Sequence, residues 1–325
     1  MAETTAAFYC VADDRYFLGA VDMVNSLRLQ GHSEPIYLLD CGLTADQRTL
    51  LEPEVRLLDA PGGTPPHLLK TVAPLASPAR TMVLIDADMI ATRSLEPLVT
   101  KAAQAGVVAF ENARARHVPE WEELLAIGEV REGPYVSSGL VALGGATGTN
   151  VLALLHELQP CVDYESTLWR ANIGDYPFLY ADQDVLNAIL HSRVRADELI
   201  TLPHSLAPTP PFRGLEIVDE TSLRCTSAAG EAPYVLHHCL RKPWLDFVHA
   251  SIYTTLLARL LLADDVAVRV RAEEVPVRLR EGVRAQLGRR LVDLKDFGRW
   301  RLGDRLPSWL GTRVESVRRR MAGGL

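Results

Sequence analysis

Residues 82–90 read Met-Val-Leu-Ile-Asp-Ala-Asp-Met-Ile, an apolar run with two carboxylates in its middle. The first four residues, 82–85, are typical of a strand that is buried on both faces. Residues i and i+2 of an extended segment point to the same side, so Asp86 and Asp88 should face one point at the carboxyl end of this strand, where open α/β sheets bind ligands. Two unpaired buried acids would repel each other and lose hydration, so we predict a divalent cation that carries phosphate oxygens. The alternative is that these acids only cap a helix or form a turn.

The segments around this run alternate between strand and helix patterns. Strands are expected at 6–12, 35–40, 55–58, 82–85, 106–110, 135–145 and 234–238, and helices at 17–30, 44–51, 67–76, 95–104, 147–158, 183–191 and 247–262. Such alternation predicts an α/β fold with a mainly parallel sheet covered on both faces. The first turn lacks Gly-x-Gly-x-x-Gly, and no Gly-x-x-x-x-Gly-Lys-Ser/Thr occurs, which disfavours dinucleotide-binding enzymes and P-loop NTPases.

Composition narrows the class of protein further. The chain has 325 residues, enough for one large α/β domain with an appendage, and its net charge of −7 argues against a nucleic-acid binder. Five cysteines without a Cys-x-x-Cys pair suit a reducing compartment. We see neither a secretory signal nor a run of about 18 apolar residues, so we expect a cytoplasmic protein, with a peripheral position at the inner face of the membrane as an open alternative.

A second motif lies far downstream, at residues 235–244, Val-Leu-His-His-Cys-Leu-Arg-Lys-Pro-Trp. A predicted strand ends here in His237 and His238, and Lys242 follows within a Lys-Pro-Trp sequence. Two carboxylates and one imidazole suit Mn²⁺ or Mg²⁺ and leave positions open for phosphate oxygens, while the lysine offers a positive charge to the same phosphates. In isolation, either histidine could instead be a hydrogen-bonded core residue and Lys242 a surface lysine.

Taken in order, these motifs resemble the GT-A glycosyltransferases, and among them glycosyltransferase family 8, which includes glycogenin and bacterial lipopolysaccharide galactosyl- and glucosyltransferases. The resemblance covers about residues 6–244. It implies a GT-A fold, that is, a Rossmann-like, mainly parallel mixed sheet flanked by helices. We therefore expect a nucleotide-sugar-binding catalytic domain at 1–245, followed by a helical, basic tail at 246–325.

The resemblance also implies roles for individual residues. The metal would be held by Asp86, Asp88 and His237, with His238 as the alternative ligand if the local register differs. Donor-binding positions would be Ala12, Asp13, Tyr16, Lys70, Asp86, Ala87, Asp88, Ser137, Ser138 and Lys242. Asp182 and Gln183, from the sequence Asp-Gln-Asp, would lie beside the anomeric carbon as the catalytic residues. The sequence departs from the family where Lys242 follows His237 by five positions instead of six and where Ser137 replaces a common Asn.

The activity implied is a retaining transfer of glucose or galactose from a UDP-sugar to an acceptor hydroxyl. Either Gln183 or Asp182 could act as nucleophile, or the acceptor could attack from the leaving-group face. Asp182 could instead only orient the sugar hydroxyls. The rival interpretations are a sugar-1-phosphate nucleotidyltransferase, which would need a basic rather than an acidic first turn, and a non-catalytic nucleotide-sugar- or glycan-binding module.

The last fifty residues differ in charge from the rest. Residues 276–325 carry 13 basic and 5 acidic side chains, a surplus of +8, which leaves −15 for the remainder. Arginines interleaved with apolar and aromatic residues can lie in a membrane interface, which would suit a carbohydrate or glycolipid acceptor of the cell envelope. The alternatives are a helix packed on the acidic body and a homodimer contact.

Overall fold

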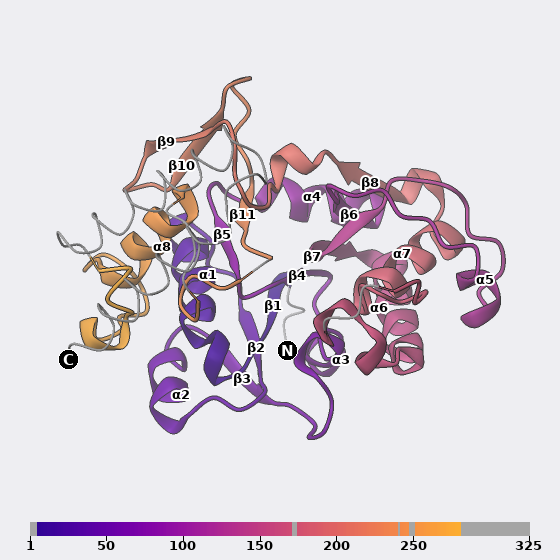
Figure 1. Ribbon diagram of the computed structural model, residues 1–325, viewed down its shortest axis with the longest axis horizontal. Coiled ribbons are helices and arrows are strands. Elements are labelled where there is room, and N and C mark those ends of the chain that lie inside the picture. The colour runs from indigo at the N-terminus through magenta and orange to yellow at the C-terminus, as the bar shows by residue number, and fades with distance from the viewer. Residues whose placement is uncertain (1–4, 171–173, 240, 247–250, 281–325) are drawn as a thin grey trace, which may run out of the picture.

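The computed structural model describes residues 5–170, 174–239, 241–246 and 251–280, and its centre is a seven-stranded sheet (Figure 1). In spatial order the strands are β3 (Arg56–Asp59), β2 (Ile36–Asp40), β1 (Ala6–Ala12), β4 (Thr81–Ile85), β7 (Val136–Gly144), β6 (Val107–Glu111) and β8 (Leu199–Leu202). The expected α/β class and mainly parallel mixed sheet are confirmed.

One strand runs against the others. β7 is antiparallel to both of its neighbours, β4 and β6, whereas the remaining pairs in the sheet are parallel. In this register Ile85, the last residue of β4, lies opposite Leu140 in the middle of β7, so the first residues of β7 extend past the end of β4. The antiparallel strand therefore brings its first residues to the edge at which β4 ends, and this edge holds the two aspartates.

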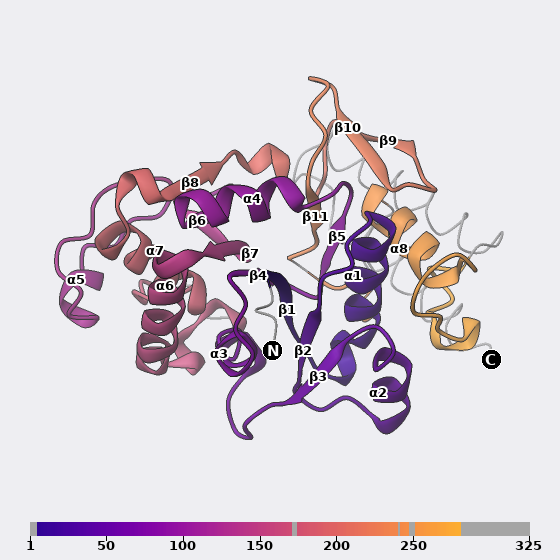
Figure 2. The same cartoon turned by 180° about the vertical axis from the view of Figure 1, so that it is seen from behind.

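Helices cover the two faces of the sheet and build two separate cores (Figure 2). α1 (Phe17–Leu29), α4 (Glu96–Ala105) and α8 (Ile252–Leu262) pack on one face. α3 (Val72–Ala76), α6 (Gly145–Leu158) and α7 (Asp182–Arg193) pack on the other. α2 (Ala45–Leu51) begins with a capping box, in which Thr44 Oγ1 accepts from Gln47 N and Gln47 Oε1 accepts from Thr44 N.

Several short elements, β8 among them, were not expected from the sequence patterns, whereas the strand expected at 234–238 is observed as β11. β5 (Met89–Ala91) pairs with β11 (Val235–His237) in an antiparallel ribbon, and β9 (Leu215–Asp219) pairs with β10 (Arg224–Ser227) in another. α5 (Trp121–Leu124) is a single turn of helix. The β5–β11 ribbon matters most, because it joins the Asp86–Asp88 region to the distant histidines.

The segment after residue 245 is partly integrated into this core. Asn25, fully buried on α1, donates to the carbonyls of Leu260 and Val268 at 2.9 Å each and accepts from Val268 N at 2.7 Å. Residues 263–280 are not the helix that was expected; they form turns and one 3-10 helix, Ala272–Glu274. The expected tail beyond 280 lies outside the described residues. Within the part of the chain that is described, no helix has the length and apolar character needed to cross a membrane.

Candidate active site

The two aspartates lie in a backbone loop that neighbouring segments hold in place. β4 ends at Ile85 and β5 starts at Met89, so Asp86, Ala87 and Asp88 bridge the main sheet and the ribbon. Asp86 N donates to Gly139 O at 2.8 Å, and Asp88 O accepts from His238 N at 2.9 Å. The strand end thus presents both side chains from a backbone that is hydrogen-bonded on each side.

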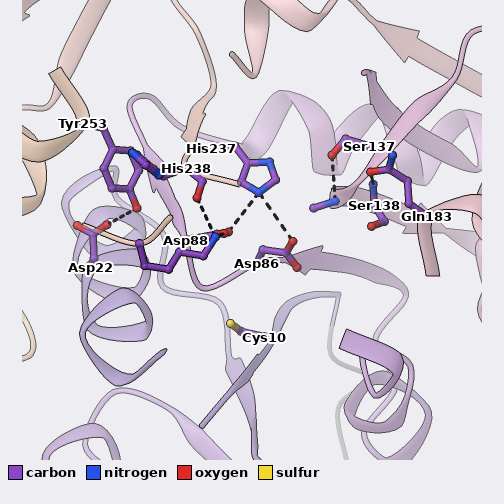
Figure 3. A network of polar contacts seen from close by, with 12 residues as sticks. Cys10, Asp22, Asp86, Asp88, Ser137, Ser138, Gln183, His237, His238 and Tyr253 are labelled. Carbon is purple, nitrogen blue, oxygen red and sulfur yellow. Dashed lines mark hydrogen bonds and ion pairs between the residues drawn. The ribbon is translucent and has the colours of Figure 1, made fainter. Parts of the chain in front are cut away.

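Three of the predicted ligands converge (Figure 3). Asp86, Asp88 and His237 each offer one ligand atom, and these atoms lie within 4.8 Å of one another. His237 Nε2 is 3.2 Å from Asp88 Oδ1 and 3.9 Å from Asp86 Oδ2. The side chain of His238 points away instead and meets the edge of Tyr253 at a ring-centroid distance of 4.9 Å. His237 is therefore the imidazole that faces the acids, and burial lowers the pKa of His238 to about 4.

Each metal-site acid also meets a lysine. Lys70 Nζ lies 2.8 Å from Asp86 Oδ1 and 3.2 Å from Asp182 Oδ2. Lys242 pairs with Asp88 and donates to His238 O at 2.8 Å. Lys242 is buried, whereas Lys70 is partly exposed. Both lysines thus lie beside the carboxylates, and the alternative that Lys242 is a surface lysine is excluded.

Burial and the neighbouring charges shift the pKa values of the two acids in opposite directions. Burial favours the neutral form of Asp88, but Lys242 and His237 together outweigh burial and hold its pKa well below the usual range. Burial raises the pKa of Asp86, and the nearby Asp88 adds to this, although Lys70 opposes both. Asp88 is therefore the firmly ionised member of the pair.

The residues present fit a divalent cation. Asp88 Oδ1 is buried and accepts no hydrogen bond, which leaves a charged oxygen free to bind a metal. The site also contains a space that only glycine leaves open, because a Cβ on Gly139 would come within 2.7 Å of His237 Cε1 and 3.1 Å of Asp86 Oδ2. Carboxylate oxygens and an imidazole nitrogen form a donor set that suits Mn²⁺.

The predicted sugar-side residues come from β7 and the start of α7. Ser138 N donates to Gln183 Oε1 at 3.2 Å, and Lys70 Nζ donates to Ser138 O and Oγ at 3.4 Å each. Ser137 Oγ accepts from Gly139 N at 3.2 Å. Asp182 is buried, and its Oδ2 faces Lys70 without accepting a hydrogen bond. Lys70 thus forms ion pairs with both Asp86 and Asp182.

The residues predicted to contact the nucleotide lie around the end of β1. Asp13 caps the short helix η1 (Asp14–Tyr16) by accepting from Tyr16 N at 2.9 Å, so its side chain already has a structural role. The Tyr16 ring lies 5.6 Å from Lys242 Nζ. Ala12 ends β1, and its carbonyl accepts from Cys41 N at 2.9 Å.

Two close contacts that the sequence did not predict hold the region around the end of β1 together. A Cβ on Gly19 would lie 2.5 Å from Ala87 O and 2.6 Å from the Trp244 ring, so a glycine is needed where α1 passes the loop of Asp86 and Asp88. Trp244 Nε1 donates to Arg15 O at 2.8 Å, which anchors the Lys-Pro-Trp sequence to the first turn of the chain. Cys10 also lies beneath the acids, as Figure 3 shows. The sequence predicted only that Cys10 lies in a buried strand, and nothing in it indicated that Cys10 is close to the acids.

Comparisons with known proteins agree with the fold. The sequence matches no protein-family model and no curated protein. Solved structures do match. The galactosyltransferase LgtC, in complex with donor and acceptor sugar analogues, is 15% identical, with 80% of this chain and 98% of that chain covered at a TM-score of 0.51. The bifunctional glycosyltransferase WbbM is 14% identical over 79% of this chain and 49% of its own, with a TM-score of 0.52. The glycosyltransferase GlyE of Streptococcus pneumoniae TIGR4 is 16% identical, with 80% of this chain and 61% of GlyE covered at a TM-score of 0.50. The likeness shows that the chain has the expected GT-A fold.

Proposed function

We propose that the chain is a metal-dependent, retaining glycosyltransferase that moves glucose or galactose from a UDP-sugar to an acceptor hydroxyl. The observation that carries the proposal is the convergence of Asp86, Asp88 and His237, from segments about 150 positions apart, beside Lys70 and Lys242. Such a cluster is costly to bury unless a charged ligand uses it. The similar fold of proteins named as glycosyltransferases supports the same assignment.

The chemistry follows from charge. Departure of UDP places negative charge on the diphosphate, and groups already oriented toward that charge lower the barrier. Asp86, Asp88 and His237 would hold Mn²⁺ or Mg²⁺, which supplies Lewis-acid stabilisation of the diphosphate when bound. Lys242 and Lys70 would add two ammonium groups that need little reorientation, because both are already held by hydrogen bonds.

The remaining predicted residues would bind the two ends of the donor. Ala12, Asp13 and Tyr16 would contact the uracil, and Ser137 and Ser138 would line the sugar. Asp182 and Gln183 would lie beside the anomeric carbon. The proposed acceptor is a carbohydrate or glycolipid, which the protein would reach at a membrane surface through the basic residues 276–325. We also propose that the chain can form a homodimer.

The decisive experiment is calorimetric titration of UDP with and without Mn²⁺, together with hydrolysis of UDP-hexoses in the absence of acceptor. UDP should bind in a Mn²⁺-dependent manner, and Asp88→Asn should abolish that dependence. Asp197→Asn, the same change at an exposed acid, is the matched control. Absence of UDP binding by the wild type would end the proposal, and release of pyrophosphate from UTP and a hexose 1-phosphate would favour a nucleotidyltransferase.

A further inference from the structure

Three aromatic rings meet at a place that the predicted metal and donor residues do not include. The centroid of the His67 ring lies 4.5 Å from that of Tyr164 and 5.9 Å from that of Trp169, and its plane is tilted by 37° and 36° to theirs. His67 belongs to the short helix η2 (Pro66–Leu68), Tyr164 to η4 (Tyr164–Ser166) and Trp169 to η5 (Leu168–Arg170). These three residues form what we call the aromatic cluster, in which two distant segments build one apolar surface.

Hydrogen bonds hold the segment that presents Tyr164 and Trp169. Thr167, which lies between them in the chain and is fully buried, donates through Oγ1 to Tyr164 O at 2.7 Å. Leu168 N donates to Leu179 O at 2.8 Å, which ties η5 to the segment that leads into α7. Trp169 is therefore presented by a backbone that is fixed on its N-terminal side.

The position of the aromatic cluster in the candidate active site follows from a row of ion pairs. Lys242 pairs with Asp88 at one end of the row, and at the other end Lys70 pairs with Asp86 at 2.8 Å and with Asp182 at 3.2 Å. Under the proposed function the diphosphate lies towards Lys242, and the anomeric carbon lies beside Asp182. A ligand group that extends past Asp182 therefore belongs to the transferred sugar or to the acceptor, and not to the nucleotide.

The aromatic cluster adjoins the Asp182 end of this row through both of its segments. His67 is three positions before Lys70, and Leu179, which accepts the bond from Leu168, is three positions before Asp182. Burial lowers the pKa of His67 to about 4, although the nearby Asp182 opposes this shift. The imidazole is therefore uncharged at neutral pH, and it completes an apolar surface next to the predicted reaction centre.

The outer part of the aromatic cluster is open to solvent. Trp169 is 49% exposed, and its neighbour Leu168 is 36% exposed. A single exposed apolar side chain needs no explanation, but an exposed indole beside two further rings and a candidate reaction centre is typical of a ligand surface. Charged side chains border this surface, since Arg170 pairs with Glu165 at 2.8 Å and its guanidinium lies 6.0 Å from the centre of the Tyr164 ring.

Aromatic rings with a charged rim match the chemistry of a sugar. A pyranose ring carries C–H groups on one face and hydroxyl groups around its edge. The C–H face packs on aromatic rings, whose negative faces attract polarised hydrogens, while the hydroxyls can bond to side chains such as Glu165 and Arg170. An acyl chain could use the rings but has no group for the charged side chains to bind. The surface therefore suits a carbohydrate better than a lipid tail.

We infer that the aromatic cluster binds a pyranose ring of the acceptor and that Trp169 is its main stacking residue. The inference rests on the proposed function, in which Ser137 and Ser138 line the transferred hexose, so that the aromatic cluster is left for the second sugar. It makes the acceptor class specific. The attacking hydroxyl belongs to a carbohydrate, either free or as the head group of a glycolipid, and not to an amino-acid side chain or a simple lipid alcohol.

The first test measures acceptor kinetics. UDP-glucose and UDP-galactose are supplied with Mn²⁺ and with methyl glycosides of glucose, galactose, mannose and N-acetylglucosamine as acceptor probes. Trp169→Ala should raise the acceptor KM about five- to tenfold, as expected for the loss of one stacking contact, while kcat and the affinity for UDP-hexose stay within about twofold of the wild type. Trp169→Phe keeps a ring and should restore most of the lost affinity.

Leu124→Ala is the matched control, because Leu124 is an apolar residue that is 52% exposed on α5 and lies outside the aromatic cluster. Its acceptor KM should equal that of the wild type. An unchanged KM in Trp169→Ala would overturn the inference. Weaker binding of UDP-hexose but not of UDP would also overturn it, because the rings would then contact the donor sugar. Reduced co-sedimentation of Trp169→Ala with anionic liposomes, together with normal acceptor kinetics, would assign the rings to a membrane instead.

The second test detects the contact without turnover. Saturation-transfer NMR with the same methyl glycosides is recorded on the wild type and on Trp169→Ala, with UDP and the diamagnetic ion Mg²⁺ present. The C–H protons of at least one glycoside should receive saturation from the wild type and lose most of it in Trp169→Ala. A wild type that binds UDP but transfers saturation to none of the glycosides would overturn this inference and leave the proposed function standing. Absence of UDP binding by the wild type would remove both.

Discussion

Gly139→Ala probes the space that the ligand side chains share. A Cβ at this position would lie 2.6 Å from Met89 Cε, 2.7 Å from His237 Cε1 and 3.1 Å from Asp86 Oδ2. The flexible end of Met89 can move aside, but the imidazole and the carboxylate would have to retreat by several tenths of an ångström. The substitution should therefore open the cluster of ligand atoms while leaving the sheet in place.

The expected loss follows from that displacement. Misplacing a binding group by about 1 Å costs on the order of 10²-fold, so Mn²⁺-dependent affinity for UDP should fall by roughly 10- to 100-fold, or about 1.4–2.7 kcal/mol. The added methyl group should also lower the free energy of unfolding by about 1–3 kcal/mol, as overpacking of a core does.

The assay is calorimetric titration of UDP into each variant, once with Mn²⁺ and once with a chelator. Gly62→Ala is the matched control, because a Cβ there would meet nothing within 4 Å. A Gly139→Ala protein that binds UDP with wild-type affinity in Mn²⁺ would refute the assignment of this space to the metal site. A loss of the same size in the chelator would show damage to the nucleotide pocket in general.

Three further outcomes are expected. Lys242→Met should lower the free energy of unfolding by about 3–5 kcal/mol, because Asp88 is left buried without the lysine ammonium. Mn²⁺ should then raise the melting temperature of the variant by more than it raises that of the wild type. Equal increases in the two proteins would contradict this prediction. Burial raises the pKa of Asp22 well above its usual range, so the native state holds a proton that the unfolded state releases above about pH 4. Stability should then fall as pH rises toward the native pKa, by up to about 1.4 kcal/mol per pH unit. Asp22→Asn should be more stable at neutral pH in urea unfolding and lack this slope, and an unchanged slope would disprove the cause. Deleting residues 281–325 should reduce co-sedimentation with anionic liposomes, and undiminished binding would count against a membrane role for the tail.

Local patterns were enough to predict six of the seven strands of the sheet, all except β8, and the residues Asp86, Asp88 and His237 that converge beside it. Two acids at the end of a buried strand need a counter-charge, so the sequence pattern alone predicted a ligand site at Asp86 and Asp88. The histidine and lysine motif was recognised by its order along the chain. What could not be read was which imidazole faces the acids, since that depends on the pairing of β11 with β5, in which His237 lies opposite Met89.

Other features depend on contacts that no local pattern encodes. β5 is only three residues long and was hidden in the apolar run that contains the acids. The helical pattern of α8 was visible, but not that Asn25 hydrogen-bonds its last turn and the segment that follows. The hydrogen bond from Ser138 N to Gln183 Oε1 joins a strand to a helix 45 positions away, and no local pattern predicts it.

The pairing of Asp88 with Lys242 also bears on how the chain comes to be folded during synthesis. The two residues are separated by 154 positions, and the ribbon that brings them together is completed only by β11. A nascent chain that stops before residue 242 contains β4 and both aspartates but lacks the cation that makes burial of Asp88 favourable. The sheet edge at the end of β4 is therefore expected to stay hydrated until residue 242, about three quarters of the way along the chain, has left the ribosome, and a product that ends earlier would leave Asp88 without this partner.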